Sequence, residues 1–159
     1  MSEGERDQAD NPGVIAPPPL IYAGALAAGL LANRRYRIPF LPRRVARTVG
    51  PALVVSGLAI GVLGSREMRR AETNLDPRKP ATTVVTEGPF RFTRNPLYLS
   101  MLLMYLGVSA LANGLAPILL LPVVQRLMRS GVIEREERYL ERKFGDEYMQ
   151  YKVGTPRWI

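Results

Sequence analysis

The chain has 159 residues, 22 of them basic and 14 acidic, and it contains neither cysteine nor histidine. Its length suits a single domain. The two missing residue types exclude disulfides, thiolate nucleophiles, imidazole bases and zinc sites of the usual ligands, so we expect no metal centre. The net charge is +8, and the basic residues flank long uncharged stretches. This pattern favours contact with anionic lipid headgroups over binding to nucleic acid.

Charged residues are segregated along the chain, and none occurs within residues 11–33, 48–65 or 95–125. A soluble domain mixes polar and apolar residues along each amphipathic element. An uncharged run of about 18 residues instead forms a helix of about 27 Å, close to the thickness of a bilayer's hydrocarbon core. The pattern predicts an all-α, polytopic membrane protein with about four transmembrane helices, folded as one membrane domain over residues 1–159.

The first half of the chain predicts two of these helices. Residues 1–13 are polar, and we expect a disordered tail. The first span, 18–32, follows a run of prolines that suits a helix start. An arginine-rich loop leads to the second span, 45–65, in which Gly57 and Gly61 form a GxxxG pair. Packing within the molecule is favoured for this pair over a dimer interface, and the oligomeric state stays open.

Asn113 and Gly114 interrupt the longest uncharged stretch, and Asn-Gly is a turn signal. We therefore expect a helical hairpin with spans 96–112 and 115–128. Beyond it, the charge pattern of residues 132–144 predicts an amphipathic tail helix that ends at Gly145. The hairpin must place residues 74–95 and 132–159 side by side at one membrane face.

Basic residues set the expected orientation. Six arginines lie in the loop between the first two spans, and the other sixteen of the 22 basic residues lie on the opposite side. Cytoplasmic loops carry the excess of Lys and Arg. We expect an integral protein of a bacterial inner membrane, with its site at the cytoplasmic face.

The two polar segments together supply arginines, glutamates and tyrosines. Such a set suits a zwitterionic small molecule, because arginine binds a carboxylate and glutamate binds an amine or ribose hydroxyls. Each residue also has a simpler interpretation. Arg91 and Arg94 would contact headgroup phosphates, and Tyr98 would anchor a helix at the membrane interface. The glutamate-bearing helix would then be a solvated face.

Residues 88–100 read GPFRFTRNPLYLS, and Glu136-Glu137 follows the hairpin. This order and spacing resemble the signature of the isoprenylcysteine carboxyl methyltransferase and phospholipid methyltransferase superfamily. Its usual form is GPYRxxRHPxYxG, followed by a hydrophobic hairpin and a paired glutamate. The resemblance covers about residues 74–159. Asn95 stands where many members have histidine, and Ser100 stands where glycine is usual.

The resemblance implies an integral-membrane methyltransferase that uses S-adenosylmethionine, held between a loop over 74–95 and a tail over 132–159. The cofactor-binding residues that we predict are Gly88, Pro89, Arg91, Arg94, Asn95, Pro96, Tyr98, Glu136, Glu137 and Tyr148. Catalytic roles are assigned to Glu137 as a base for an amine or thiol acceptor, to Tyr98 as an aromatic face for the sulfonium, and to Arg157 as the group that orients a carboxylate acceptor.

The acceptor that we expect is lipidic or membrane-partitioned, with a carboxylate, amine or thiol as its reacting group. Two alternatives remain at this stage. One is a non-catalytic membrane scaffold or regulatory protein that retains the fold, and the other is a reductase relative that uses a nicotinamide cofactor.

Overall fold

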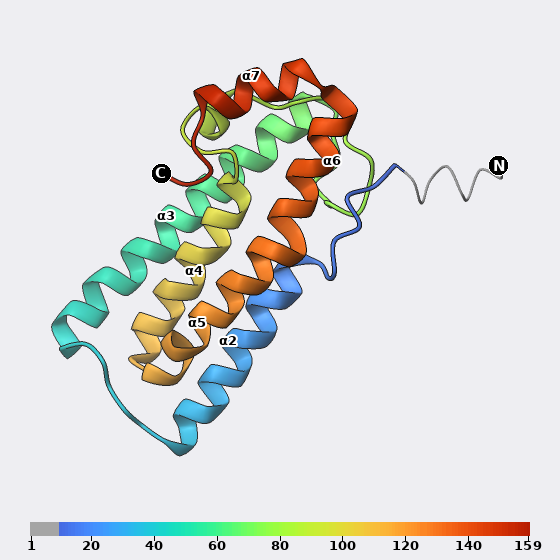
Figure 1. The fold of residues 1–159 in the computed structure, drawn as a ribbon. Coiled ribbons are helices and arrows are strands. Elements are labelled where there is room, and N and C mark those ends of the chain that lie inside the picture. Colours follow the sequence, from blue (N-terminus) through green and yellow to red (C-terminus); the bar gives the residue numbers. More distant parts are fainter. Residues whose placement is uncertain (1–9) are drawn as a thin grey trace.

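The computed structural model describes residues 10–159, and within them the chain forms only helices and connecting loops, with no β-strand (Figure 1). The all-α prediction is therefore confirmed for this part of the chain. The elements are α2 (Pro18–Arg35), α3 (Arg43–Arg70), the 3-10 turn η1 (Gly88–Arg91), α4 (Pro96–Ala112), α5 (Leu115–Met128), the π-helical turn η2 (Arg129–Ile133), α6 (Glu134–Phe144) and α7 (Asp146–Gly154).

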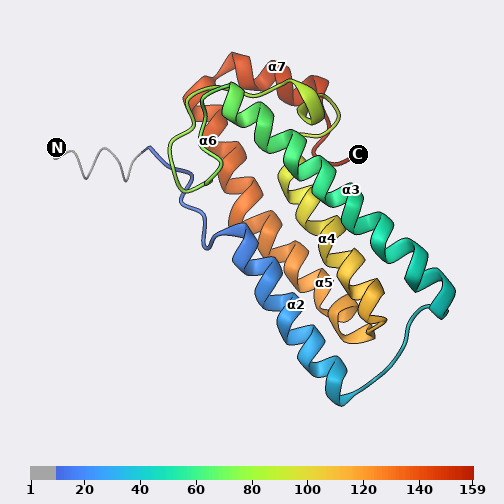
Figure 2. The ribbon, with the colours of Figure 1, turned by 180° about the vertical axis from the view of Figure 1, so that it is seen from behind.

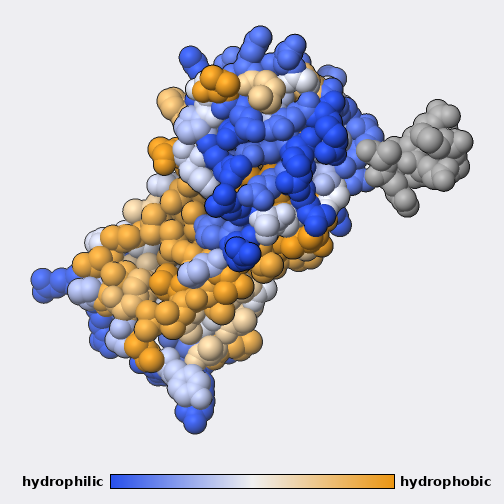
Figure 3. Space-filling view, in the orientation of Figure 1, coloured by the Kyte–Doolittle hydropathy of each residue, from blue (hydrophilic) through white to orange (hydrophobic). Residues whose placement is uncertain are grey.

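Four long helices, α2 to α5, lie side by side as a bundle (Figures 1 and 2). The α2–α3 loop and the α4–α5 turn lie at one end, and α6, α7 and the loop before α4 lie at the other. Hydrophobic residues cover the middle of the bundle on the face shown in Figure 3, with hydrophilic residues at both ends. By length and composition, two helices could cross a membrane: Arg43–Arg70 and the continuous helix Leu115–Phe144.

Helix boundaries follow the turn chemistry of the sequence. Helices α4 and α5 have the bounds expected for the hairpin, because Asn113 adopts a left-handed conformation (φ 45°, ψ 47°) that ends α4. Helices α2 and α3 are longer than the apolar stretches that predicted them and run to Arg35 and Arg70. Arginine is a good helix former, so both helices continue past their apolar parts into the polar ends of the bundle.

Helix α3 approaches α4 closely through its glycines. A Cβ atom added at Gly61 would lie 2.6 Å from Ser100 Oγ, and one added at Gly57 would lie 2.9 Å from the backbone oxygen of Ser100. Both distances are too short for a real side chain. The GxxxG pair therefore packs within the molecule, and Gly61 makes the room that Ser100 needs.

The N-terminal segment contacts α6. Residues 1–9 of the expected disordered tail lie outside the described part of the chain. The remainder of that tail is ordered: the Lys143 ammonium lies 2.7 Å from Asp10 Oδ2, and Arg135 donates to the backbone oxygen of Gly13 at 2.7 Å. The prediction was based on local polarity alone, and these partners lie more than 120 residues away in the sequence.

Candidate functional site

The loop before α4 and the C-terminal tail are joined by hydrogen bonds through their backbones. Arg94 N donates to the oxygen of Pro156 at 2.9 Å. The Thr93 hydroxyl and the Asn95 side-chain amide both donate to the oxygen of Arg157, at 2.8 and 3.2 Å. The structure thus brings together the two polar segments that the hairpin was expected to align. Asn95 uses its amide to hold the tail in place.

Glu137 is the centre of a buried ion cluster. Arg157 donates to both of its carboxylate oxygens, from Nε at 3.0 Å and from Nη2 at 2.6 Å. Arg94 Nη1 lies 3.2 Å from Oε1 of the same carboxylate. The hydrogen bond to Glu137 raises the pKa of Arg157. Two guanidinium groups from different segments therefore share one buried carboxylate.

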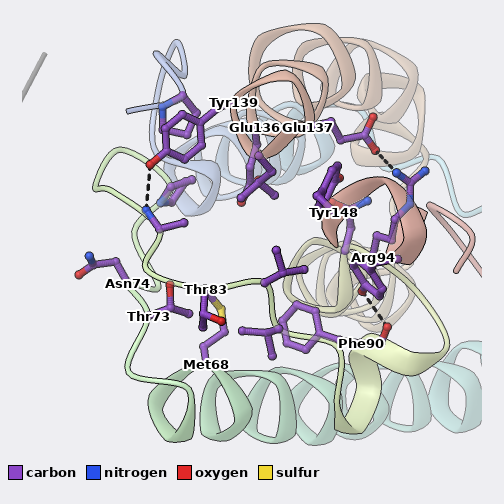
Figure 4. A pocket seen from close by; sticks show the side chains of 18 of the residues that line it. Met68, Thr73, Asn74, Thr83, Phe90, Arg94, Glu136, Glu137, Tyr139 and Tyr148 are labelled. Carbon is purple, nitrogen blue, oxygen red and sulfur yellow. Dashed lines mark hydrogen bonds and ion pairs between the residues drawn. The ribbon is translucent and has the colours of Figure 1, made fainter. Parts of the chain in front are cut away.

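Arg94 retains binding capacity beyond this ion pair. Its side chain is only 10% exposed, yet Nε and Nη1 are buried without a well-aligned hydrogen bond. Guanidinium donors that are buried and unpaired are costly. Arg94 also borders the pocket seen in Figure 4. An anionic group bound there would provide the missing acceptors.

Glu136 and Glu137 are adjacent on α6 but point in different directions, because successive residues of a helix differ by about 100° around its axis (Figure 4). Glu136 accepts a hydrogen bond from the Tyr98 hydroxyl at 2.6 Å and borders the pocket. Unlike Glu137, it forms no ion pair with any residue from 10 to 159. The two glutamates therefore have different environments.

Two adjoining hollows, of about 80 and about 290 Å³, lie between the loop, α6 and α4. They share the side chains of Met68, Asp76, Pro77, Phe90, Arg94, Asn95 and Glu136. The smaller hollow is also bordered by Glu137, Tyr139, Tyr148 and Tyr151, and the larger one by Pro96, Tyr98 and Met101. Ligands in the two hollows would therefore contact the same side chains.

Two tyrosines of α7 form an aromatic wall of the smaller hollow. The rings of Tyr148 and Tyr151 meet edge to face, with their centroids 6.2 Å apart, and Tyr151 donates to the oxygen of Phe90 at 2.7 Å. Burial raises the pKa of Tyr148 to about 12, and it also raises the pKa of Tyr151. Both phenols therefore stay protonated at neutral pH.

The loop after α3 covers the smaller hollow. Ala81 N donates to the Tyr139 hydroxyl at 3.1 Å (Figure 4), and Thr82 N donates to Thr73 Oγ1 at 3.1 Å. These contacts tie the loop to α6 on one side and to its own first residues on the other. Asp76 and Met68 border the site although no motif marked them. The loop itself carries only a compositional signal, because its prolines and β-branched residues favour an extended chain.

The predicted site residues divide into three groups. Those that line the hollows are Arg94, Asn95, Pro96, Tyr98, Glu136, Glu137 and Tyr148. Gly88, Pro89 and Arg91 line neither hollow and form η1. Gly88 has a positive φ of 59°, and a Cβ there would lie 2.7 Å from Glu67 Cγ, so this glycine permits a tight turn. Arg157 acts on the site through Glu137. Among residues 10–159, no group of His, Cys, Asp and Glu side chains is placed to hold a metal ion.

The chain was compared with known proteins. The family model described as phospholipid methyltransferase matches residues 45–147. The cobalt-zinc-cadmium resistance protein CzcN of Cupriavidus metallidurans is 39% identical over 77 residues, which are 48% of this chain and 35% of that protein. The protein-S-isoprenylcysteine O-methyltransferase of Schizosaccharomyces pombe is 34% identical over 76 residues, 48% of this chain and 32% of that protein.

A further relative, an uncharacterized protein of Haemophilus influenzae, is 43% identical over 67 residues, 40% of this chain and the whole of that protein. The chain spans about a third of the length of the first two relatives. No solved structure matches it. The matched region of the family model covers more than half of the chain and includes the loop, the hairpin and the paired glutamates. The resemblance seen in the sequence is therefore confirmed, and the chain belongs to the membrane-associated phospholipid methyltransferase family.

Proposed function

We propose that this protein is a membrane methyltransferase that uses S-adenosylmethionine to methylate a lipidic or membrane-partitioned acceptor. The observation that carries the proposal is Arg94, a buried arginine with unpaired donors at the wall of a pocket that also holds Glu136. A cation and an acid placed across a small pocket are complementary to an amino acid. Family membership supplies the reaction class.

The residues of the smaller hollow fit this cofactor. Arg94 would bind the carboxylate of the methionine part through Nε and Nη1, the two buried donors that make no well-aligned hydrogen bond within residues 10–159. With a carboxylate acceptor, which needs no base, Glu136 would bind the ammonium group or the ribose hydroxyls. The rings of Phe90 and Tyr148 border the same hollow and would contact the adenine or the sulfonium. At about 80 Å³ the hollow is below the usual range for ligand sites, so the covering loop must shift when the cofactor binds.

When bound, S-adenosylmethionine supplies an electrophilic methyl group on a sulfonium. The protein's part is to position the acceptor and to exclude water, which are the main contributions to such a displacement. An amine or thiol acceptor must also lose a proton. The ion cluster around Glu137 favours Glu136 for that role, because Glu136 has only the Tyr98 hydroxyl as a partner. Glu137 instead positions Arg94 and Arg157.

The acceptor would occupy the larger hollow. This hollow continues into an apolar groove on the bundle surface, and the two share Pro19, Leu75, Leu97 and Met101. The groove itself is bordered by Leu58 and Val62 of α3, whose side chains are about half exposed. Such a surface suits contact with lipid chains. A hydrophobic acceptor could then reach the site from the bilayer without crossing water.

We further infer that α2, α3, α4 and the first part of the α5–α6 helix all cross the membrane as one domain. Supporting this inference, α2, α3 and α5 expose large apolar side chains, among them Leu31 at 62%, Val55 at 65% and Leu119 at 67%. Exposure of this kind is costly in water and favourable in lipid. The site then lies at the end of the bundle that carries most of the basic residues, the cytoplasmic face of a bacterial inner membrane.

Calorimetric titration of the detergent-purified protein with S-adenosylhomocysteine tests the proposal. We expect micromolar binding by the wild-type protein and a loss of at least about tenfold in Arg94→Ala, since a charge-assisted pair contributes about 1.5–3 kcal/mol. Arg91→Ala is the matched control. It lies in the same motif, is exposed and lines neither hollow, so its affinity should stay within about twofold, as for surface substitutions generally.

Absence of binding by a folded wild-type protein would overturn the proposal. Equal losses in the Arg94 and Arg91 variants would show that the pocket is not the cofactor site. Folding is checked through Trp158, the single tryptophan of the chain, which packs against the hydrophobic core.

A further inference from the structure

Six arginines crowd the end of the bundle opposite the candidate site, in the stretch from Arg34 to Arg47. No Asp or Glu occurs between residues 11 and 66, nor between residues 88 and 133. Among residues 10–159, every ion pair involves a basic residue outside this stretch. The positive charge at this end is therefore not compensated by any carboxylate of residues 10–159.

Four of the six arginines border a common hollow of about 630 Å³, namely Arg34, Arg37, Arg43 and Arg47. Its remaining wall includes the apolar side chains of Leu41, Ala46 and Leu111. Arg35 and Arg44 belong to the same stretch but do not line it. The hollow thus combines several cations with an apolar floor, and it uses a specific subset of the arginines.

Asn113 fixes the backbone of this hollow. Its side-chain oxygen accepts hydrogen bonds from Phe40 N at 3.2 Å and Leu41 N at 3.0 Å, and its amide donates to the oxygen of Leu41 at 2.8 Å. A fourth bond joins Leu115 N to the oxygen of Ile38 at 3.0 Å. The α2–α3 loop, residues 36–42, is therefore held against the α4–α5 turn before any ligand binds. This lowers the conformational entropy that is lost on binding.

The position of two arginines at the start of a helix further favours the binding of an anion. Arg43 and Arg44 lie in the first turn of α3, which has no acidic residue. The amino terminus of a helix carries a partial positive charge, so cations are unfavourable there. A bound anion would relieve both this effect and the mutual repulsion of the guanidinium groups.

We propose that this hollow binds the phosphate headgroup of an anionic phospholipid, with the glycerol and the first part of the acyl chains on Leu41 and Leu111. Guanidinium groups match the geometry of phosphate oxygens. A lipid, as opposed to a free phosphate, is favoured because Leu41, Ala46 and Leu111 give the hollow an apolar floor, and the Leu111 side chain is exposed. The site lies at the other end of the molecule from the candidate cofactor pocket and does not depend on the function proposed for that pocket.

Native mass spectrometry of the delipidated protein in a neutral detergent tests this site with short-chain phosphatidylglycerol as the probe. Arg37→Gln/Arg43→Gln removes two arginines of the hollow, and Arg35→Gln/Arg44→Gln removes the same charge from the same stretch outside it. We expect the first variant to weaken binding of one phosphatidylglycerol about tenfold or more and the second less than about threefold, given about 1 kcal/mol for each arginine at a lipid surface.

Three outcomes would overturn the proposal. Equal weakening in both variants would mean general attraction to a basic loop, and no weakening in either would mean that the lipid binds elsewhere. Binding of glycerol 3-phosphate as tight as that of the lipid would assign the site to a soluble phosphate. S-adenosylhomocysteine titration of the same variants checks the far end of the molecule, where an unchanged affinity is expected.

Discussion

The two ends of the bundle use arginine in opposite ways. At the site end, Arg94 and Arg157 share the buried carboxylate of Glu137. At the other end, six arginines lie at the end of α2, in the α2–α3 loop and at the start of α3, without any acidic partner from the described residues. The residue type is the same in both places. What differs is the carboxylate that α6 supplies to one end only.

This difference distinguishes arginines that stabilise the fold from arginines that are free to bind a ligand. Where a glutamate is buried between guanidinium groups, Arg157 is part of the fold and fixes the C-terminal tail. Where no glutamate is present, the arginines have no carboxylate partner among the described residues and stay available for an external anion. The count of basic residues at each end therefore says less about function than the location of the acidic ones.

The largest effect is expected from Glu137→Ala, which removes the carboxylate that the two arginines share. Breaking a buried pair leaves uncompensated charge, and the usual cost is about 3–5 kcal/mol. We expect the free energy of unfolding to fall by that amount. The measurement is titration of the folded protein with a denaturing detergent, followed through Trp158, whose neighbour Arg157 binds Glu137.

Arg47→Ala is the matched control at the other end, because its side chain is exposed and has no carboxylate partner among the described residues. Its effect on the free energy of unfolding should stay within about 0.5 kcal/mol. Similar costs for the two substitutions would contradict the distinction between the ends.

A smaller effect on stability is expected from substitution of Asn113, whose side chain is bonded to the α2–α3 loop. Asn113→Gly keeps the left-handed backbone but removes three side-chain hydrogen bonds, so we expect a loss of about 1–2 kcal/mol of stability. Asn113→Ala adds roughly another 1 kcal/mol, since alanine disfavours that conformation. Both variants should also weaken phosphatidylglycerol binding, measured as above. Stability lost without any change in lipid binding would mean that the loop need not be fixed to bind lipid.

The hairpin could be predicted from sequence because its signals are local. An uncharged stretch, an Asn-Gly turn and a proline just after the turn specify two helices, and α4 and α5 have the expected bounds. The pairing of the loop with the tail followed from the same geometry. The family signature then marked Arg94, Asn95, Tyr98 and the two glutamates, all of which border the hollows.

The contacts that decide individual roles were beyond local signals. Adjacent glutamates look equivalent in sequence, yet one binds Tyr98 and the other two arginines. Asp10 is held in place by an ion pair with Lys143, which lies far away in the sequence. Asn113 carried a turn signal, but nothing in its neighbourhood indicated that its side chain would hold Leu41. Such contacts depend on how the helices pack, which no sequence window contains.

The smallest effect on stability is expected from an exposed ion pair at the site end. It tests whether exposed charges there stabilise the fold as the buried ones do. Asp76 accepts from Arg78 Nη2 at 2.8 Å in the loop that covers the cofactor pocket. The hydrogen bond from Arg78 lowers the pKa of Asp76 from its ordinary 3.8 to about 2. The folded loop therefore gains stability above pH 3.8, and this stability is lost as the pH falls towards 2. Because solvent screens the pair, the gain is under about 1 kcal/mol.

Hydrogen exchange of the loop at pH 5 and pH 2.5 measures this contribution. After correction for the intrinsic exchange rates, protection of residues 76–80 should fall by up to about fivefold between the two pH values. Asp76→Asn has no carboxylate to protonate and should show the lower protection at both. If wild type and variant change alike with pH, the Asp76–Arg78 pair does not stabilise the loop, and hydrogen bonds such as those to Tyr139 and Thr73 hold it instead. The charge of this exposed pair would then add nothing to the stability that the buried Glu137 cluster gives the site end.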